Sequence, residues 1–358
     1  MSFTLGVTKE MVHGIDQARM GEAIAGMGAH LRDAASRTLA AFDGVILPKK
    51  NAIENIVLAG LGGSAIGGDL VRSYLHSRIG IPFLINRTYD LPGFVDEHTL
   101  VIASSYSGST EESLSMFEQA LRKGAKIICI TTGGKLADLA TEHSLPLITL
   151  PTGFQPRAAL AYSFVPVLLT LEKIGFTAGE SANIQDAAAT LESLSASYGV
   201  SNLTDSNHAS TLANILLSKI PVIYSASDLF DSVNIRWRGQ IQENAKHVAF
   251  GNVLPEMNHN EINGWDFPHN AQERFCVIFL RSMSDEHPQV TKRFGILHEV
   301  LLSKGVEVKE FVAQGNSVLA RMFSLISLGD WLSYYLALLA GVDPSPVPVI
   351  MQLKSKLV

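Results

Sequence analysis

The sequence has little charge, few cysteines and no long apolar run, and each shortage excludes a class of protein. Charged residues make up 17% of the 358 positions and hydrophobic ones 47%, which is typical of a globular chain and not of a disordered one. The net charge of −6 gives no general attraction for nucleic acid or for an anionic membrane surface. We therefore expect neither nucleic acid nor a membrane as a partner.

The two cysteines and the apolar segments indicate the compartment. Cys129 (KIICITT) and Cys276 (RFCVIFL) both lie in strand-like apolar runs, so we expect two buried thiols and a reducing, cytoplasmic compartment. The start MSFTLGVTKEMVHGID has no cationic segment leading into an apolar one, so no signal peptide is expected there. No run reaches the roughly 18 apolar residues of a membrane span, and LSYYLALLAGV is predicted to be a core helix.

Short β-branched runs alternate with helical stretches through the first half of the chain. A leading helix is predicted over residues 15–42, and strands at NIVLAG, PFLIN, TLVIAS, KIICIT and LPLITL. Such an alternation favours a doubly wound parallel sheet, whose ligands bind beyond the carboxyl ends of its strands. The length of the chain allows two such α/β domains.

The second half repeats this pattern after a mostly helical section over residues 158–218. Strands are predicted at PVIYSAS, HVAFGN, RFCVIFLR and VEVKEF, and FLRSMSDEHPQVTKRFGILHEVLLSKGVEVKEF imitates IASSYSGSTEESLSMFEQALRKGAKIICI. We therefore predict two related α/β domains with flanking helices, residues 1–180 and 181–358. Because Asp285 and Glu286 in the second copy would repel a phosphate, only the first copy is predicted to bind an anion.

Small hydroxyl side chains gather where the strand TLVIAS meets the following helix, in SSYSGSTEES at residues 104–113. A helix N-terminus leaves several backbone N–H groups without partners and carries a partial positive charge, so it binds phosphate readily. The side chains of Ser105, Ser107 and Thr110 add hydroxyl donors, and Gly108 allows close approach. The alternative is a capping box of Ser109 and Glu112. One hydroxyl is enough for a cap, so the number of hydroxyls favours phosphate.

A glycine-rich corner, AGLGGSAIGGDL, follows the strand NIVLAG. Its spacing approximates a dinucleotide-binding turn, but the acidic residue expected about 20 residues later is replaced by Asn86-Arg87. The segment also lacks the Gly-Lys-Ser/Thr of a nucleotide-binding loop. We interpret Gly62, Gly63 and Ser64 as a backbone clamp for a small phosphorylated ligand.

Together these two corners resemble the sugar isomerase (SIS) domain. The further segments PTGFQPRAAL, RGQIQENAKH, PEMNHNEI and DPSPVPVIMQLKSKL extend the resemblance over nearly the whole chain, to the bifunctional phosphoglucose/phosphomannose isomerase family with its two SIS domains. The resemblance implies interconversion of glucose 6-phosphate and mannose 6-phosphate with fructose 6-phosphate through an enediol(ate), with no metal and no cofactor. It also implies a place in carbohydrate metabolism, in glycolysis and gluconeogenesis.

The resemblance assigns four catalytic residues. Glu243 matches the family's base, although by itself it would be interpreted as a helical partner of Lys246 or His247. His259 matches the ring-opening histidine, and a loop histidine bonded to its polar neighbours is the alternative. Arg157 matches the arginine that faces the enediolate, a group that a guanidinium can bind through two hydrogen bonds.

The last of the four is a ring-opening lysine near the end of the chain. Its spacing best fits Lys354, with Lys356 in reserve, and the apolar VPVIMQL before it predicts a docked segment.

The family's sites are completed by a histidine from a neighbouring subunit, so a homodimer with His259 acting in trans is expected. The loop FGNVLPEM between Glu243 and His259 is consistent with this, and MFSLISLGDWLSYYLALL supplies either an interface or a core. Three other functions compete with a phosphoglucose/phosphomannose isomerase: a non-catalytic sugar-phosphate sensor, an amino-sugar isomerase coupled to a glutaminase, and a zinc mannose-phosphate isomerase. The chain has no N-terminal cysteine nucleophile for the second and no H-x-H or H-E-x-x-H for the third.

Overall fold

The computed structural model describes residues 6–357, which form two compact units. The five-stranded unit comprises Gly26–Ala189 and Ser317–Ala320. The four-stranded unit comprises the described residues up to Ala25, Thr190–Asn316 and the described residues from Arg321 onward. Since neither unit is a single stretch of chain, the predicted boundary between residues 180 and 181 stays a prediction. Residues 1–5, where the absence of a signal peptide was expected, lie outside the described part.

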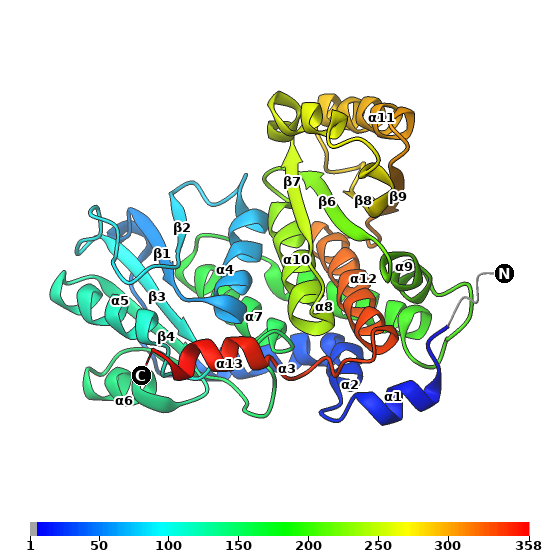
Figure 1. Ribbon diagram of the computed structural model, residues 1–358. Helices are drawn as coiled ribbons and strands as arrows, with labels where there is room; N and C mark the ends of the chain where they lie inside the picture. Colours follow the sequence, from blue (N-terminus) through cyan, green and yellow to red (C-terminus); the bar gives the residue numbers. More distant parts are fainter. Residues whose placement is uncertain (1–5, 358) are drawn as a thin grey trace. The chain divides into compact units, whose positions relative to one another are not determined.

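The five strands predicted in the first half are confirmed, and they form one parallel sheet in the order β2-β1-β3-β4-β5 (Figure 1). Their bounds are β1 Asn55–Ala59, β2 Phe83–Asn86, β3 Thr99–Ser105, β4 Lys126–Thr131 and β5 Leu147–Thr149. The strand order reverses between β1 and β3. In sheets of this kind, the crevice for a ligand opens beyond the carboxyl ends at this reversal.

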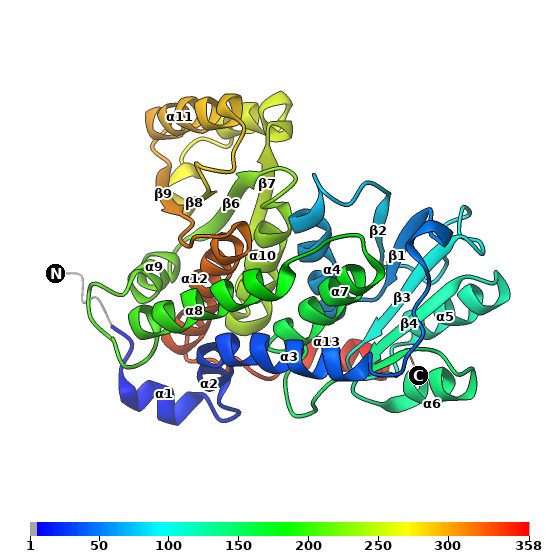
Figure 2. The same ribbon diagram turned by 180° about the vertical axis from the view of Figure 1, so that it is seen from behind.

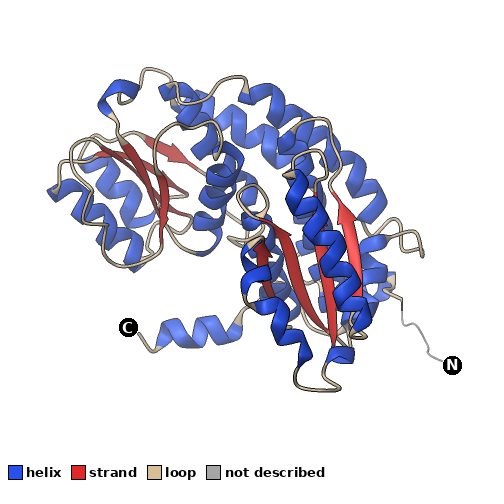
Figure 3. Cartoon of the chain, turned by 90° about the horizontal axis from the view of Figure 1, so that it is seen from above, coloured by secondary structure: helices blue, strands red, loops and turns tan. Residues whose placement is uncertain are grey.

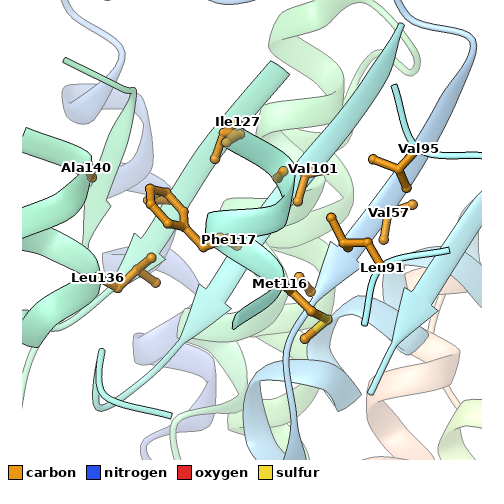
Figure 4. Close-up of a cluster of buried hydrophobic side chains, with 13 residues drawn as sticks. Val57, Leu91, Val95, Val101, Met116, Phe117, Ile127, Leu136 and Ala140 are labelled. Carbon is orange, nitrogen blue, oxygen red and sulfur yellow. The ribbon is translucent and has the colours of Figure 1, made fainter. Parts of the chain in front are cut away.

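Helices cover both faces of the five-stranded sheet (Figure 2). They are α3 Met27–Ala41, α4 Gly62–Leu75, α5 Glu111–Arg122, α6 Gly134–Glu142 and α7 Leu160–Ile174, with the 3-10 turn η1 Lys50–Ala52 and the start of α8 Glu180–Tyr198. On one face Phe117 of α5 and Leu136 of α6 pack onto Val101 and Ile127, all buried (Figure 4). On the other face α4 packs onto Leu58 of β1, and a Cβ on Gly68 would lie 2.6 Å from a methyl carbon of that leucine. Burying apolar surface on both faces explains the uninterrupted apolar strands.

The second sheet has four parallel strands in the order β7-β6-β8-β9, which repeats the order of the first four strands. Their bounds are β6 Ile220–Ala226, β7 Phe250–Leu254, β8 Phe275–Arg281 and β9 Glu307–Val312. The repeat predicted from the sequence is confirmed, because β8 is followed by α11 Pro288–Ser303 and β9, as β3 is followed by α5 and β4. Strand β7 begins later than the predicted HVAFGN, because Lys246 adopts a left-handed backbone with φ of 54° and the chain becomes extended only after it.

Different elements cover the two faces of the four-stranded sheet (Figure 3). Helix α10 Asp231–Ala245 lies on the face of Ser225, whose Oγ is 3.3 Å from the Asn234 Nδ2 donor. The opposite face carries Tyr224, and there α11 and the 3-10 segments η2 Glu256–His259 and η3 Glu261–Asp266 form the core. The remaining elements are α1 Lys9–Ile15, α2 Met20–Ala25, α9 His208–Leu216, η4 Gln272–Arg274, α12 Val318–Leu339 and α13 Pro348–Ser355.

The predicted leading helix over residues 15–42 is confirmed only in part, because the helix begins at Met20 and is divided at Gly26. The chain forms α1, α2 and α3, with a break after Ile15 in which Arg19 has φ of 56°. The cause is Asp16, whose carboxylate accepts hydrogen bonds from the backbone N–H groups of Met20 and Gly21 at 2.7 and 2.9 Å. An aspartate at such a place starts a new helix instead of continuing the previous one.

Helix α12 is longer than the predicted core segment. The helix has 22 residues and is long and apolar enough to cross a membrane. However, 94% of an 18-residue stretch of it is buried inside the protein. That burial is typical of a core helix and confirms this part of the prediction.

The two cysteines are buried as predicted, and burial raises the pKa of both Cys129 and Cys276 to about 12.

Candidate active site

The two corners identified in the sequence touch each other at the reversal of the five-stranded sheet. The backbone N–H of Tyr106, after β3, donates a hydrogen bond of 3.1 Å to Oγ of Ser64, in the first turn of α4 after β1. Ser64 is buried. The contact places Gly62, Gly63 and Ser64 beside the hydroxyl corner, at the position where sheets of this order bind ligands.

Hydrogen bonds within the hydroxyl corner fix its shape. Oγ of Ser105 lies 2.9 Å from Oγ1 of Thr110 and accepts a bond of 3.1 Å from the N–H of Gly108. Oγ of Ser107 accepts a longer bond of 3.3 Å from the N–H of Ser109. The capping box is wrong: α5 has Thr110 as its N-cap residue, with no side-chain cap bond, so Ser109 does not cap the helix. Capping therefore does not account for the cluster of hydroxyls.

A third corner, which the sequence analysis missed, supports the hydroxyl corner. It is the segment 131–134 (TTGG), which begins with the last residue of β4. The N–H and Oγ1 of Thr132 both donate to the carbonyl of Tyr106, at 3.1 and 2.7 Å. A Cβ on Gly108, whose φ is +67°, would lie 1.7 Å from the carbonyl oxygen of Gly133. The signal that could have found this corner is the run of small residues at the end of a third apolar strand.

Arg157 lies in the loop after β5, and this loop is joined to both corners. The hydroxyl of Tyr106 donates to the carbonyl of Pro151 at 2.9 Å and accepts from the N–H of Phe154 at 3.2 Å. A Cβ on Gly63 would lie 2.6 Å from the carbonyl of Pro156, so only glycine allows this approach. Arg157 is itself buried, with 5% of its surface exposed. A buried cation on a loop that contacts both corners is suited to an anionic ligand.

The dinucleotide alternative finds no support at the end of β2. Nδ2 of Asn86 donates to the carbonyl of Asp90 at 2.8 Å, and the guanidinium of Arg87 pairs with Asp69. A ribose hydroxyl needs an available acidic acceptor at this position. The structure instead uses Asn86 and Arg87 for internal bonds.

Glu243 lies in the four-stranded unit, near the C-terminus of α10. Its helix is held against α12 by Trp237, whose Nε1 donates to the Leu325 carbonyl at 2.8 Å, and by a buried ion pair of Arg236 with Asp330 at 2.7 Å. Complete burial raises the pKa of Asp330, and Arg236 acts against that shift. These contacts fix the axis of the helix that carries Glu243.

The side chain of Glu243 is half-buried in a groove of about 630 Å³. The groove is lined by the end of α10, the residues leading into β7, and Val347–Ile350. His247 also lines it, and its Nδ1 lies 2.8 Å from the carbonyl of Val248. Glu243 is thus located at the end of the four-stranded sheet where the strands begin.

His259 lies at the other end and on the other face of the same sheet. It is the last residue of η2, beyond the carboxyl end of β7, and its side chain is exposed. With a rise of about 3.3 Å per residue, β7 alone separates the two ends by roughly 13 Å. Because α10 covers the face of Ser225 and η2 the face of Tyr224, the sheet stands between Glu243 and the histidine of its own unit.

Lys354 lies in the last turn of α13 and is exposed. The prediction that VPVIMQL is docked is wrong, because α13 has no buried residue and its Val349 and Met351 are 76% and 62% exposed. Lys356, held in reserve, directly follows the helix and is also exposed.

The corner of the second copy is occupied by two carboxylates of its own, and that only the first copy binds an anion stays a prediction. The backbone N–H of Ser282 donates to Oε1 of Glu286 at 2.9 Å, and Arg281 pairs with the same carboxylate at 2.7 Å. Arg321 makes two bonds of 2.7 Å to Asp285. Burial acts to raise the pKa of Asp285, but the bonds from Arg321 and Ser282 outweigh it and hold that pKa below its usual value.

The structure therefore brings together part of the predicted site in each unit. The five-stranded unit joins Gly62, Gly63, Ser64, Ser105, Ser107, Thr110 and Arg157 at one edge of its sheet. The four-stranded unit holds Glu243, His259 and Lys354, with Glu243 and His259 at opposite ends of β7. Within the described residues, no group of three or more His, Cys, Asp or Glu side chains is arranged to hold a metal ion.

Comparisons with known proteins agree with this division. A model described as "SIS domain" matches residues 51–172, and one described as "Bacterial phospho-glucose isomerase C-terminal SIS domain" matches residues 205–357. A protein of Caldicellulosiruptor bescii named bifunctional phosphoglucose/phosphomannose isomerase is 44% identical, over 86% of this chain and 91% of its own. One of the same name from Aquifex aeolicus is 37% identical, over 85% and 90%.

A solved structure gives the same fold at lower sequence similarity. Tagatose-6-phosphate ketose/aldose isomerase from Escherichia coli superimposes with a TM-score of 0.70 at 16% identity, covering 90% of this chain and 93% of that one. At this identity the likeness concerns the fold alone. The chain, with two SIS domains and relatives this similar over most of its length, belongs to the bifunctional phosphoglucose/phosphomannose isomerase family.

Proposed function

We propose that this protein is an aldose–ketose isomerase that interconverts glucose 6-phosphate and mannose 6-phosphate with fructose 6-phosphate. The observation that carries the proposal is the junction of Ser64, the hydroxyl corner and the Arg157 loop at the strand reversal, in a chain of this family. The phosphate is bound by the N-terminus of α5 and by the hydroxyls of Ser105, Ser107 and Thr110, without any lysine. Gly62 and Gly63 let the α4 turn approach the sugar.

The chemistry needs a base, an acid for the ring oxygen and a stabiliser of negative charge. In the proposed mechanism, Glu243 removes the proton from C2 of the open-chain aldose and returns it to C1, while a second proton passes from O2 to O1, which gives fructose 6-phosphate through an enediolate. Arg157 stabilises the charge on the enediolate oxygens with its two parallel donors. His259 and Lys354 move the proton that opens and closes the ring. No metal or cofactor takes part.

The proposed enzyme is a homodimer in which His259 serves the site of the neighbouring chain. Support comes from the four-stranded unit, where the sheet separates Glu243 from the histidine of its own chain. An exposed histidine on a well-anchored loop is suited to reach across a two-fold interface. The proposed setting is the cytoplasm, where the reaction belongs to glycolysis and gluconeogenesis, with neither nucleic acid nor a membrane as partner.

A coupled assay of the purified protein tests the proposal. Each aldose phosphate is supplied separately, with and without EDTA, and fructose 6-phosphate is measured. We expect turnover of both substrates and no effect of the chelator. Binding of either sugar phosphate without turnover would favour the sensor, although the relatives at 44% and 37% identity are named as enzymes. Activity that EDTA removes and zinc restores would contradict the metal-free mechanism.

A further inference from the structure

Glu261, two residues after His259, connects the histidine loop to the middle of the four-stranded sheet. Its Oε1 accepts a hydrogen bond of 2.5 Å from the hydroxyl of Tyr224 in β6. Its Oε2 accepts one of 2.6 Å from Nδ2 of Asn252 in β7. Trp265, in the same 3-10 segment as Glu261, donates from Nε1 to the Tyr224 hydroxyl at 3.2 Å. Both oxygens of one carboxylate are thus bonded to neighbouring strands.

This network is buried on its tyrosine and tryptophan side, while Glu261 and Asn252 are half-buried. Tyr224 is fully buried and Trp265 is 9% exposed. Burial raises the pKa of Tyr224, and the hydrogen bond to Glu261 raises it further. The phenol therefore remains a neutral donor to the carboxylate. Charge-assisted bonds of this kind are stronger than neutral ones and cost more to break when buried.

The histidine loop is fixed on both sides of His259. Before it, Met257 is fully buried in the core with Leu254 and Phe279. After it, Oδ1 of Asn260 accepts from the N–H of Glu261 at 2.6 Å and caps η3, which Glu261 connects to the strands. Between these anchors Asn258 is half-buried and His259 is exposed. With its backbone held on both sides, the His259 imidazole can move only by rotation about its own side-chain bonds.

We propose that Glu261, together with Tyr224 and Asn252, is the positioning residue for the proton transfer by His259. It does not touch the sugar; it holds the loop so that the imidazole reaches the ring oxygen. This inference rests on the proposed isomerase function. A displacement of a reacting group by about 1 Å can reduce a rate by roughly 100-fold, so loosening the loop should be costly.

The test compares Tyr224→Phe and Glu261→Gln with His259→Ala. We expect each to lower kcat on the ring-closed sugar phosphate by roughly 10- to 100-fold, with KM within about twofold and with an open-chain analogue turned over normally. Amide hydrogen exchange over residues 255–266 should become faster in both loop variants. The matched control is Tyr74→Phe, which removes a similar bond of 2.7 Å from a buried tyrosine to Glu180 in the other unit. It should lower stability without this kinetic pattern.

The outcomes separate the inference from the proposed function. If His259→Ala loses activity on the ring-closed sugar while Glu261→Gln and Tyr224→Phe keep it, the positioning role is wrong and the isomerase proposal stands. Equal losses on ring-closed and open-chain substrates would also overturn it, because they would indicate a general structural defect. If the unchanged protein isomerises no sugar phosphate, the proposed function fails, and with it the role assigned to Glu261.

Discussion

The backbone N–H of Tyr106 donates a hydrogen bond of 3.1 Å to the hydroxyl of Ser64, and this bond joins two corners that are 42 residues apart in the chain. The phenol of the same tyrosine contacts the loop that leads to Arg157. Tyr106 therefore links the proposed phosphate site to the proposed enediolate site. Changes on either side of it should affect substrate binding or turnover before they affect the fold.

Replacing a hydroxyl of the corner should weaken substrate binding. Ser107→Ala and Thr110→Ala each remove a donor to a charged phosphate oxygen, a bond of about 1–3 kcal/mol, so KM should rise roughly 5- to 150-fold. Steady-state kinetics on glucose 6-phosphate measures the effect. Ser115→Ala, in the helix that follows the corner and bonded to the Tyr89 carbonyl at 2.9 Å, is the control and should leave KM unchanged. A lower melting temperature with unchanged KM would indicate a purely structural role.

Gly108→Ala should distort the phosphate site. Its φ of +67° costs a residue with a side chain about 1–3 kcal/mol, and the new Cβ would lie 1.7 Å from the Gly133 carbonyl, so that one of the two loops must move. We expect a lower melting temperature and a loss of sugar-phosphate binding, measured by scanning and titration calorimetry. Gly14→Ala, with no atom within 4 Å of the new Cβ, is the control. Normal binding by Gly108→Ala would place the phosphate elsewhere.

Glu243→Gln should separate binding from chemistry. The amide keeps the shape of the side chain but cannot accept a proton, so exchange of the C2 hydrogen with solvent deuterium should stop while the sugar phosphate still binds. The measurement is NMR of the substrate in D₂O, with binding followed by titration. Gln242→Ala, a neighbour whose Nε2 donates to the Ala249 carbonyl at 3.0 Å, is the control and should retain exchange. Persistent exchange in Glu243→Gln would assign the base to another residue.

Mixed dimers should reveal whether His259 acts in trans. Glu243→Gln and His259→Ala proteins, each inactive alone, are unfolded and refolded together. One of the two sites in each heterodimer then holds an intact glutamate and an intact histidine, so activity should return to up to half of the normal value per heterodimer. Native mass spectrometry confirms that heterodimers form. If they form and remain inactive, the histidine serves its own chain, despite the sheet between the two side chains.

Acid should reduce the contribution that Asp285, in the corner of the second copy, makes to the stability of the fold. The pKa of Asp285 is lower in the folded protein than in the unfolded chain, so its ionised form stabilises the fold above about pH 4, and this contribution is lost as the pH falls through the folded pKa. Asp285→Asn should therefore be less stable than the unchanged protein at pH 7, and the difference should shrink below about pH 4. Urea unfolding at a series of pH values measures this. A difference that is constant with pH would show that the charge of Asp285 contributes nothing.

The sequence by itself determined the local elements and the chemistry of the corners. Apolar β-branched runs bounded by glycine and small polar residues specify short buried strands, and both sheets follow that pattern. The hydroxyls of Ser105, Ser107 and Thr110 likewise predict a site for an anion from their composition alone. Such features depend on neighbours within a few residues, and these can be read directly along the chain.

The tertiary structure decided which of these features meet. No local pattern indicates that Ser64 accepts from Tyr106, or that Glu261 is bonded to Tyr224, since these partners are 42 and 37 residues apart. The sequence likewise left open that the second sheet stands between Glu243 and His259, which lie only 16 positions apart. Strand order determines such relationships, because it is set by the burial of whole sheets against their helices and not by the spacing of individual residues.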